Sequence, residues 1–523
     1  MKHYFSRGPE DALVATTKGT VRGYCYDGLL IFKGIPYAKA KRFHAPEPME
    51  PWEGILDAGS YGMVCPLMTN ERPKGELLVP HRYWPMDENC QNLNIWTPAT
   101  DDGKRPVLVW LHGGGFFAGS SIEQVAYDGA NMARLGDAVV VSLNHRLNIL
   151  GYLDLSEYGA EYANSGNAGG DDIIAALSWI HDNIAAFGGD PDNVTVFGQS
   201  GGGAKVTTLL QSPAADGLFS KGVVMSGVLD KLMNEREDSA KPLVEGLLRE
   251  LNLTDVRQLE TVDYVPLSRA YQKVSKPLEE AGKYVGGLPR KNAFYLGTPS
   301  KNGFRPETAH IPLLVGSTFG EFAPFVHAPS CKLGMTEKEQ ETLIRETLGE
   351  ERAEKLIALF AKAYPERNIA DVLDMDFLFR QPQIPYIAER SRLNSCTWSY
   401  LFNMDQPIEG RSTPWHCSDI PFFFHNIDLV EHPHGKNIPE DLAQRLEEQM
   451  FGLLMAFART GNPQLEQLPL WEASTAGYER TLILDANPRV LVNHDHILIN
   501  ELTDAMEQVM QRSMETNSDS LQH

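Results

Sequence analysis

The sequence predicts an α/β fold in which helices cover both faces of a mostly parallel sheet. Two patterns support this prediction. Short runs of β-branched and aromatic residues, typical of strands buried on both faces, recur at 106–111, 138–143, 194–197 and 222–227. Apolar residues at helical spacing lie between these runs, most clearly at 172–187. Strands that alternate with helices pair as a parallel sheet covered on both sides.

Further elements extend this pattern to both ends of the chain. Residues 1–100 predict β structure with turns, and the C-terminal part predicts a helix, a last strand and a polar helix. The expected strands lie at 17–23 (as a hairpin), 29–35, 92–97, 311–316, 397–402 and 481–484, and the expected long helix lies at 441–460.

Two polar, helical blocks interrupt the series of strands. They lie at about 231–297 and 336–394, each between two expected sheet strands. A block inserted there is a candidate cap over a site at the end of the sheet. We therefore predict a single domain over residues 1–523 with cap-like insertions in these two blocks.

The composition indicates a globular protein and excludes two classes of partner. The 523 residues are 42% hydrophobic and 22% charged, with a mean hydropathy of −0.29, values typical of a chain with a large core. The net charge of −22 repels phosphate backbones and anionic lipid, so nucleic acid and membrane surfaces are not expected partners. We see no signal peptide or membrane span and expect a cytoplasmic monomer or weak homo-oligomer. The six scattered cysteines suit neither a disulfide scaffold nor a zinc cluster, so no metal is expected.

A strand–turn–helix segment carries the strongest functional signal. The run at 194–197 leads directly into residues 198–202, GQSGG, and then into an apolar segment that can form a helix. This is the context of a G-x-S-x-G nucleophile elbow, in which a strained turn presents the serine above the sheet. Flanking glycines avoid collisions with the strand and the helix. Ser200 is therefore a candidate nucleophile.

Three consecutive glycines predict a site for a negatively charged oxygen. They follow the strand at 106–111 in the sequence HGGGFF, residues 112–117. Backbone N–H groups in such a loop are unobstructed, which suits an oxyanion hole. His112 is expected to shape this loop rather than to act as a base.

A serine, an acid and a histidine occur in the chain order of known serine hydrolases. Ser200 is followed by Glu321, just past the strand at 311–316, and then by His416, in the loop after 397–402. Histidine can take the serine proton and return it to a leaving group, and a carboxylate holds the imidazole in the required tautomer.

With these motifs the chain resembles the type-B carboxylesterase/lipase family, which includes bacterial para-nitrobenzyl-type esterases and the cholinesterases. The resemblance runs end to end. It rests on FKGIPYA at 32–38, ENCQNLNI at 88–95, the glycine loop, FGGDP at 187–191, the elbow and FARTGNP at 457–463. It implies an α/β-hydrolase fold and hydrolysis of carboxylic esters through an acyl-enzyme, without a cofactor.

The resemblance also assigns roles to residues. It implies Ser200 as nucleophile, Glu321 as acid and His416 as base. The oxyanion donors would be the backbone N–H groups of Gly114, Gly115 and Gly201. Ser226 stands where the family has a serine that supports the acid and base, although it could equally be an ordinary buried hydroxyl.

Several positions depart from the family pattern. Gln199 replaces a glutamate, which removes a buried negative charge and argues against a cationic, choline-like substrate. Gly201 replaces an alanine but keeps its N–H group. The loop around Glu321 differs from the usual pattern, so another carboxylate remains an alternative acid. His145 replaces a tyrosine, and Cys417 replaces the glycine after the histidine, where we interpret it as a small buried filler.

Two further pairs of residues match positions that are structural in the family. Cys65 and Cys90 fall where secreted relatives form a disulfide, and we favour two reduced thiols here. Arg42 and Glu88 match a buried family ion pair.

Four phenylalanines near the motifs are candidates for the walls of an apolar acyl or alcohol pocket. Each of them could equally belong to the core. They are Phe116, Phe117, Phe319 and Phe422.

The sequence therefore predicts a serine carboxylesterase acting on small to medium uncharged esters, its partner being a small-molecule ester. One alternative is an esterase specialised for aromatic esters of the feruloyl or para-nitrobenzyl type. Another is a non-catalytic interaction module on the same fold. Family members of that class lose the nucleophile or its partners, whereas this chain keeps all three residues.

Overall fold

The computed structural model describes residues 4–520 except residue 9 and segments 69–80, 230–232, 234–236, 323–333, 409–410 and 431–440. Within the described residues, no helix is both long and apolar enough to cross a membrane.

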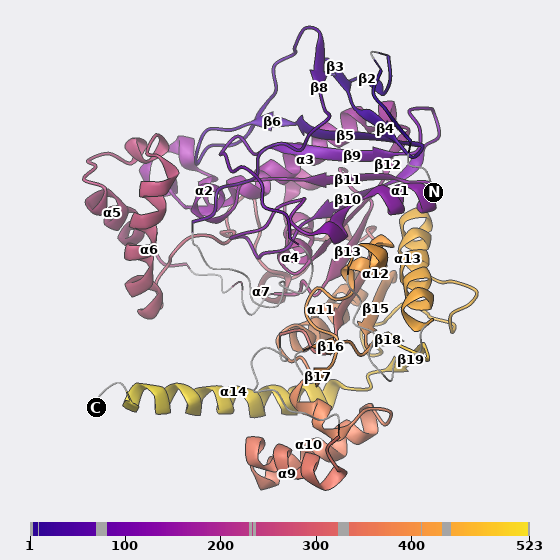
Figure 1. Cartoon of the computed structure of the whole chain (residues 1–523). Coiled ribbons are helices and arrows are strands. Elements are labelled where there is room, and N and C mark those ends of the chain that lie inside the picture. Colours follow the sequence, from indigo (N-terminus) through magenta and orange to yellow (C-terminus); the bar gives the residue numbers. More distant parts are fainter. Residues whose placement is uncertain are drawn as a thin grey trace.

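The central element is a sheet of twelve strands (Figure 1). Its members are β1 (Phe5–Ser6), β4 (Tyr24–Tyr26), β5 (Leu29–Pro36), β9 (Asn92–Thr97), β10 (Arg105–Leu111), β11 (Val139–Leu143), β12 (Gly189–Gln199), β13 (Lys221–Met225), β14 (Leu313–Thr318), β15 (Thr397–Phe402), β18 (Arg480–Leu484) and β19 (Arg489–Val492). Their order is β1-β4-β5-β9-β11-β10-β12-β13-β14-β15-β18-β19.

Pairing in this sheet is mostly parallel, as predicted. All neighbours from β11 to β18 run parallel. The strands from β1 to β9 pair antiparallel at one edge, and β19 pairs antiparallel at the other. Each strand predicted for this sheet is present, but β1, β4 and β19 were not predicted because each is short and at most partly buried.

Helices cover both faces because alternate residues of each strand point to opposite sides. In β10, Leu108 and Trp110 join one hydrophobic core, whereas Val107, Val109 and Leu111 join another. The first core contains α1 (Ala130–Gly136), α12 (Ile420–Phe424) and α13 (Leu442–Thr460), and the second contains α3 (Ala168–Asn183), α4 (Gly201–Leu210) and α11 (Arg380–Leu393).

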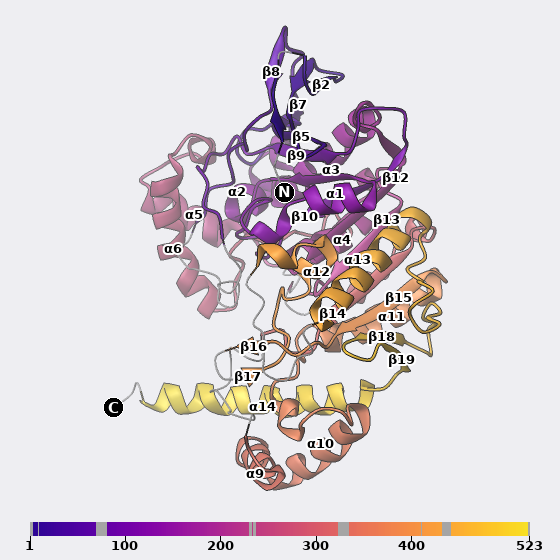
Figure 2. The same ribbon diagram turned by 45° about the vertical axis from the view of Figure 1, so that its right-hand side comes forward.

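The two predicted helical blocks occupy different parts of the molecule. The first contains α5 (Lys241–Glu250) and α6 (Tyr264–Glu280), which pack on each other. In the second, α9 (Glu337–Leu348) and α10 (Glu350–Ala363) pack with the C-terminal helix α14 (His496–Ser520). Figures 1 and 2 both show α5 and α6 on one side of the sheet and α9 and α10 beside α14.

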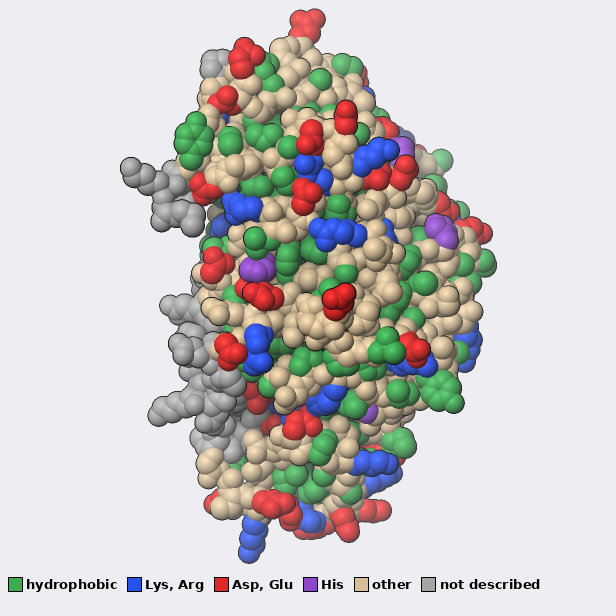
Figure 3. Space-filling model, turned by 90° about the vertical axis from the view of Figure 1, so that its right-hand side faces the viewer, with side chains coloured by type: hydrophobic (Ala, Val, Ile, Leu, Met, Phe, Trp, Pro, Cys, Tyr) green, Lys and Arg blue, Asp and Glu red, His purple; other side chains and the backbone are tan. Residues whose placement is uncertain are grey.

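Short elements complete the fold. The predicted hairpin is formed by β2 (Leu13–Ala15) and β3 (Thr20–Arg22), with β8 (Ile55–Asp57) beside it. The remaining short elements are β6 (Ala38–Lys39), β7 (Glu47–Pro48), β16 (Pro407–Ile408), β17 (Arg411–Ser412), α2 (Asn148–Tyr152) and α7 (Pro299–Asn302). On the face drawn in Figure 3, acidic and basic side chains are interspersed among apolar ones.

Candidate active site

The predicted catalytic residues lie at one edge of the sheet. Ser200 follows β12 directly, Glu321 lies just past β14, and His416 lies in the loop after β15. These three strands run parallel, and the carboxyl ends of parallel strands meet at one edge, where open α/β sheets place their ligands. The fold therefore brings together residues that are far apart in the sequence.

Ser200 occupies a strained turn. Its backbone has φ 57° and ψ −125°, and its N–H donates to the carbonyl of Met225 at 2.8 Å. Positive φ is unfavourable for a residue with a Cβ atom and is tolerated where the surrounding structure enforces it. The surroundings of this turn are tightly packed, since a Cβ atom on Gly202 would lie 2.0 Å from the carbonyl oxygen of Leu111. The turn thus presents Ser200 at the start of α4.

A buried hydrogen-bonded pair joins Glu321 to His416. The imidazole Nδ1 contacts Glu321 Oε2, and the His416 backbone N–H donates to the Glu321 carbonyl at 3.0 Å. Glu321 Oε1 accepts hydrogen bonds from Ser226 Oγ at 2.6 Å and from the Thr318 N–H at 2.7 Å. Because Nδ1 is engaged by the carboxylate, Nε2 is the nitrogen with a free lone pair.

Among the described hydrogen bonds, none joins the Ser200 hydroxyl to the His416 imidazole. Catalytic hydrogen bonds of this kind are often long without substrate and tighten in the substrate complex.

Aromatic rings and an amide enclose the imidazole. The rings of Phe322 and Phe379 lie 4.1 and 5.0 Å from it, centroid to centroid. The Gln199 amide nitrogen lies 3.4 Å from His416 Nδ1 and 3.3 Å from Nε2, and this near-equal spacing places the amide against the ring face. Cys417 Sγ donates to Gln199 Oε1 at 3.1 Å. The thiol thereby directs the NH₂ end of the amide toward the histidine.

Two further carboxyl groups lie near Glu321. Burial raises the pKa of Asp419 to about 7, and the charge of Glu321 acts in the same direction. Burial and Glu321 likewise raise the pKa of Asp376 well above its ordinary value. Asp419 accepts a hydrogen bond from the Tyr400 hydroxyl at 3.0 Å, and Asp376 accepts one from the Phe379 N–H at 3.0 Å. These two carboxyl groups therefore fix neighbouring parts of the chain around Glu321.

The glycine loop lies against the first turn of α4. Gly114 and Gly115 have φ values of 80° and 63°, which favour glycine. A Cβ atom on Gly114 would lie 2.4 Å from the Ala118 carbonyl oxygen, and one on Gly201 would lie 2.1 Å from that of Gly115. The predicted oxyanion residues are thus adjacent, with Gly114 and Gly115 in the loop and Gly201 in the helix.

A cavity of about 910 Å³ opens onto Ser200. Phe116 and Phe117 line it, together with Phe322 and Phe379. Most of the other lining residues come from the first helical block. They include Met233, Tyr284 and Leu288 and charged residues of both signs, Glu237, Glu279, Arg290 and Lys291, and Leu229 precedes the block. Ser200 therefore shares this cavity with four phenylalanine rings.

The structure places two predicted pocket residues elsewhere. Phe319 packs among Phe360 and Tyr364, with the Arg367 guanidinium 4.0 Å from its ring centre. Phe422 is fully buried in the core. A residue next to a motif can point to either side of its strand or helix, which spacing alone does not decide.

Sequence reasoning missed Phe322 and Phe379 as cavity residues. Phe322 directly follows Glu321, so its position beside the predicted acid was an available signal. Phe379 comes from the start of the distant helix α11 and gave no signal in the sequence.

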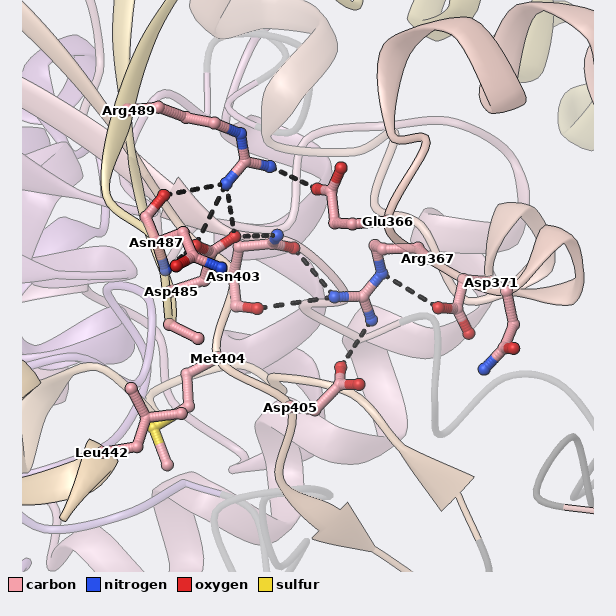
Figure 4. A pocket seen from close by; sticks show the side chains of 12 residues that line it. Glu366, Arg367, Asp371, Asn403, Met404, Asp405, Leu442, Asp485, Asn487 and Arg489 are labelled. Carbon is pink, nitrogen blue, oxygen red and sulfur yellow. Dashed lines mark hydrogen bonds and ion pairs between the residues drawn. The ribbon is translucent and has the colours of Figure 1, made fainter. Parts of the chain in front are cut away.

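A second cavity, of about 560 Å³, has its charges already paired (Figure 4). Arg367 bonds Asp371 at 2.9 Å and Asp405 at 2.6 Å, and Arg489 bonds Asp485 at 2.9 Å. Asn403 joins the two groups, accepting from Arg367 and donating to Asp485 at 2.9 Å each. This network links the segments that follow β15 and β18. Its charged groups are paired with one another and not left free for a ligand.

Other predictions made from the sequence concern structural residues. Cys65 and Cys90 are free thiols, as favoured, and the hydrogen bond to Cys65 together with burial raises the pKa of Cys90. Arg42 and Glu88 form the expected ion pair, with Arg42 Nε 2.8 Å from Glu88 Oε2. Among the described residues, no group of three or more His, Cys, Asp or Glu is arranged to hold a metal ion.

Known proteins are similar to this chain over most of its length. The profile of the carboxylesterase family matches residues 10–503. The para-nitrobenzyl esterase of Bacillus subtilis (strain 168) is 35% identical over 485 residues, covering 91% of this chain and 95% of that protein. The phenmedipham hydrolase of Pseudarthrobacter oxydans is 32% identical over 507 residues, covering 93% and 98%.

A similar solved structure is that of an esterase from anaerobic Clostridium hathewayi described as able to hydrolyse aliphatic aromatic polyesters. It is 46% identical, with a TM-score of 0.92, and the match covers 96% of this chain and 100% of that one. A thermophilic para-nitrobenzyl esterase follows with 32% identity and a TM-score of 0.73, covering 94% and 99%.

Proposed function

Since the chain belongs to the carboxylesterase family and is a carboxylic ester hydrolase, we propose that Ser200 is its nucleophile, His416 its base and Glu321 its acid. The observation that carries this proposal is the buried Glu321–His416 pair at the same sheet edge as the strained Ser200, whose side chain faces the large cavity. Such a pair activates a serine that is otherwise a weak nucleophile.

The reaction then proceeds in two halves. Ser200 Oγ attacks the ester carbonyl carbon while His416 Nε2 takes its proton. The carbonyl oxygen becomes an oxyanion, which the N–H groups of Gly114, Gly115 and Gly201 stabilise. Collapse of this intermediate expels the alcohol, which takes the proton from His416 and leaves an acyl-enzyme.

Water completes the cycle. His416 takes a proton from a water molecule, and the resulting hydroxide attacks the acyl carbon. Collapse releases the acid and returns the proton to Ser200. Glu321 stabilises the imidazolium in both halves without taking its proton.

The cavity favours an aromatic ester as the second candidate substrate class. Phe116, Phe117, Phe322 and Phe379 supply phenyl rings near Ser200, and aromatic pairs contribute about 0.5–1.5 kcal/mol beyond their buried area. The names of the relatives, which include para-nitrobenzyl esterases and a hydrolase of aliphatic aromatic polyesters, support the same class.

One experiment tests both parts of the proposal. Hydrolysis of para-nitrophenyl esters from acetate to decanoate, and of the benzoate, would be measured for wild type and Ser200→Ala. We expect turnover that falls at least about 10³-fold in the variant and a benzoate kcat/KM no lower than that of the hexanoate. Wild-type turnover that survives in Ser200→Ala would contradict the nucleophile. A benzoate that is a far poorer substrate than every aliphatic ester would contradict the aromatic preference.

A further inference from the structure

A buried lysine lies beneath the glycine loop and has no part in the reaction described above. Lys205 is on α4, and only 1% of its surface is exposed. Its Nζ donates to the His112 carbonyl at 2.9 Å, at the point where β10 ends and the loop begins. Burying an ammonium group is costly unless hydrogen bonds or an opposite charge compensate for the lost water.

The rest of the loop is anchored elsewhere. Its turn is closed by the N–H groups of Phe117 and Ala118, which donate to the Gly114 carbonyl at 3.2 and 3.0 Å. Its far end is held by the N–H of Asn148, which donates to the Phe116 carbonyl at 2.7 Å. These bonds fix the loop to itself and to α2. The Lys205 bond ties the loop to the helix that begins after Ser200.

This tie matters because the proposed oxyanion donors come from two elements. Gly114 and Gly115 belong to the loop, whereas Gly201 belongs to α4. Catalytic groups have to be held within about 0.5 Å of their productive geometry. The tight packing of Gly201 against Gly115 sets how closely the two elements approach. The bond from Lys205 is a direct link between the same two elements.

Lys205 lies among other buried titratable groups. Burial lowers the pKa of His112 and of His145 well below its ordinary value, so both rings are neutral at pH 7. Burial lowers the pKa of Lys205 to about 7, and the nearby Glu123 acts in the opposite direction. The Phe116 ring lies 5.8 Å from Nζ, on the side of the loop.

We propose that Lys205 is a positioning residue of the oxyanion hole, which holds the glycine loop against the nucleophile helix through the His112 carbonyl. The inference rests on the proposed ester-hydrolase mechanism. Lys205 acts through the backbone and touches neither substrate nor reacting atoms. Its loss should therefore weaken binding of the tetrahedral oxyanion without weakening binding of the planar ester.

The test is Lys205→Met, which keeps the four-atom stem of the side chain but removes its donor nitrogen. The matched control is Lys221→Met. Lys221 is also buried, but it begins β13, so it lies at the opposite edge of the sheet from Ser200, where its Nζ contacts Ser220 Oγ at 3.3 Å. Replacing a buried charged residue by an apolar one of similar volume is often neutral for stability, so both variants should fold.

The expected signature separates positioning from packing. In Lys205→Met we expect kcat for para-nitrophenyl butyrate to fall about 10- to 100-fold, with KM within about threefold, as for loss of an oxyanion contact. The rate of inactivation by a para-nitrophenyl alkylphosphonate, which forms a tetrahedral adduct on the serine, should fall by a similar factor. Lys221→Met should leave all three quantities within about twofold of wild type.

A folded Lys205→Met with wild-type kcat and phosphonate reactivity would overturn the inference, as would an equal loss in Lys221→Met. Should Lys205→Met not fold, Lys205→Gln decides in its place, since its amide ends one bond short of the lysine nitrogen and the same signature is expected. Absence of ester turnover in the wild type would instead contradict the proposed function.

Discussion

At the scale of single residues, the Ser226 hydroxyl orients the carboxylate of Glu321. It supplies one of the two hydrogen bonds that Glu321 Oε1 accepts, the other coming from the Thr318 backbone. Hydrogen bonds to charged groups are worth about 1.5–3 kcal/mol. The carboxylate that orients the base is therefore itself oriented by a side chain from the next strand end.

We expect Ser226→Ala to lower kcat about tenfold with little change in KM, because a less well-held Glu321 stabilises the imidazolium less well. The measurement is steady-state hydrolysis of para-nitrophenyl butyrate. The matched control is Ser399→Ala, since Ser399 Oγ makes a bond of the same 2.6 Å length to the buried Glu479, away from the cavity. Equal kcat losses in the two variants would show that the effect is one of general stability.

Cys417 and Gln199 both depart from the family pattern, and the structure puts them in contact. Cys417→Ala should lower kcat about two- to tenfold, because the Gln199 amide loses a donor that fixes its orientation against His416. Cys417→Ser keeps a donor and should retain most of the activity. If the Ala and Ser variants both have wild-type activity, Cys417 is only a small buried filler.

At the scale of elements, glycines set how closely α4 approaches the sheet. Gly202→Ala should abolish activity or folding, since the new Cβ atom would lie 2.0 Å from the Leu111 carbonyl oxygen. Gly170→Ala is the control, because this glycine lies in α3 without positive φ, and a methyl group there would meet no atom of the packed surroundings within 4 Å. It should stabilise the protein by about 0.5–1 kcal/mol. The measurements are thermal and urea unfolding of both variants, together with their rates of ester hydrolysis.

Element order and type follow closely from the sequence because each strand and helix carries its own periodicity. The strand 397–402 has the predicted bounds, and the helix predicted at 441–460 spans Leu442–Thr460. The helix predicted at 172–187 begins earlier, at Ala168, and its last turn is a 3₁₀ helix, Ile184–Phe187. Element ends depend on local hydrogen bonds, which apolar spacing does not encode.

At the scale of the whole molecule, a buried ion network joins distant parts of the C-terminal half. Arg380, at the start of α11, bonds Glu479 Oε1 at 2.6 Å and Asp495 Oδ1 at 2.7 Å. Although burial opposes ionisation, the Arg380 charge lowers the pKa of Glu479 to about 2 and that of Asp495 below its ordinary value. The network therefore ties α11 to the segments before β18 and before α14.

Arg380→Met should destabilise the protein by about 3–5 kcal/mol at pH 7, because two buried carboxylates lose their cation. The folded-state pKa values are depressed, so the stability they contribute is present above about pH 4.5 and is lost as the pH falls toward 2. The cost of Arg380→Met, measured by urea unfolding, should therefore be smaller at pH 3 than at pH 7. A cost that does not change with pH would contradict this account.

The sequence by itself determined the fold class, the order of the strands along the chain and the candidate residues Ser200, Glu321 and His416. These features rest on local patterns, namely apolar periodicity, glycines at a sharp turn and short motifs, which hold whatever the distant parts of the chain do. The alternatives left open for Ser226 and for the thiols of Cys65 and Cys90 could not be settled in this way.

The tertiary structure alone decided which distant residues meet. It placed Ser226 on Glu321, Cys417 on Gln199, and Phe379 beside His416. It also buried Phe319 and Phe422 in the core and placed Lys205 beneath the glycine loop. The physical reason is that such contacts depend on strand order in the sheet and on the packing of helices across it, and both are set by burial summed over the whole chain.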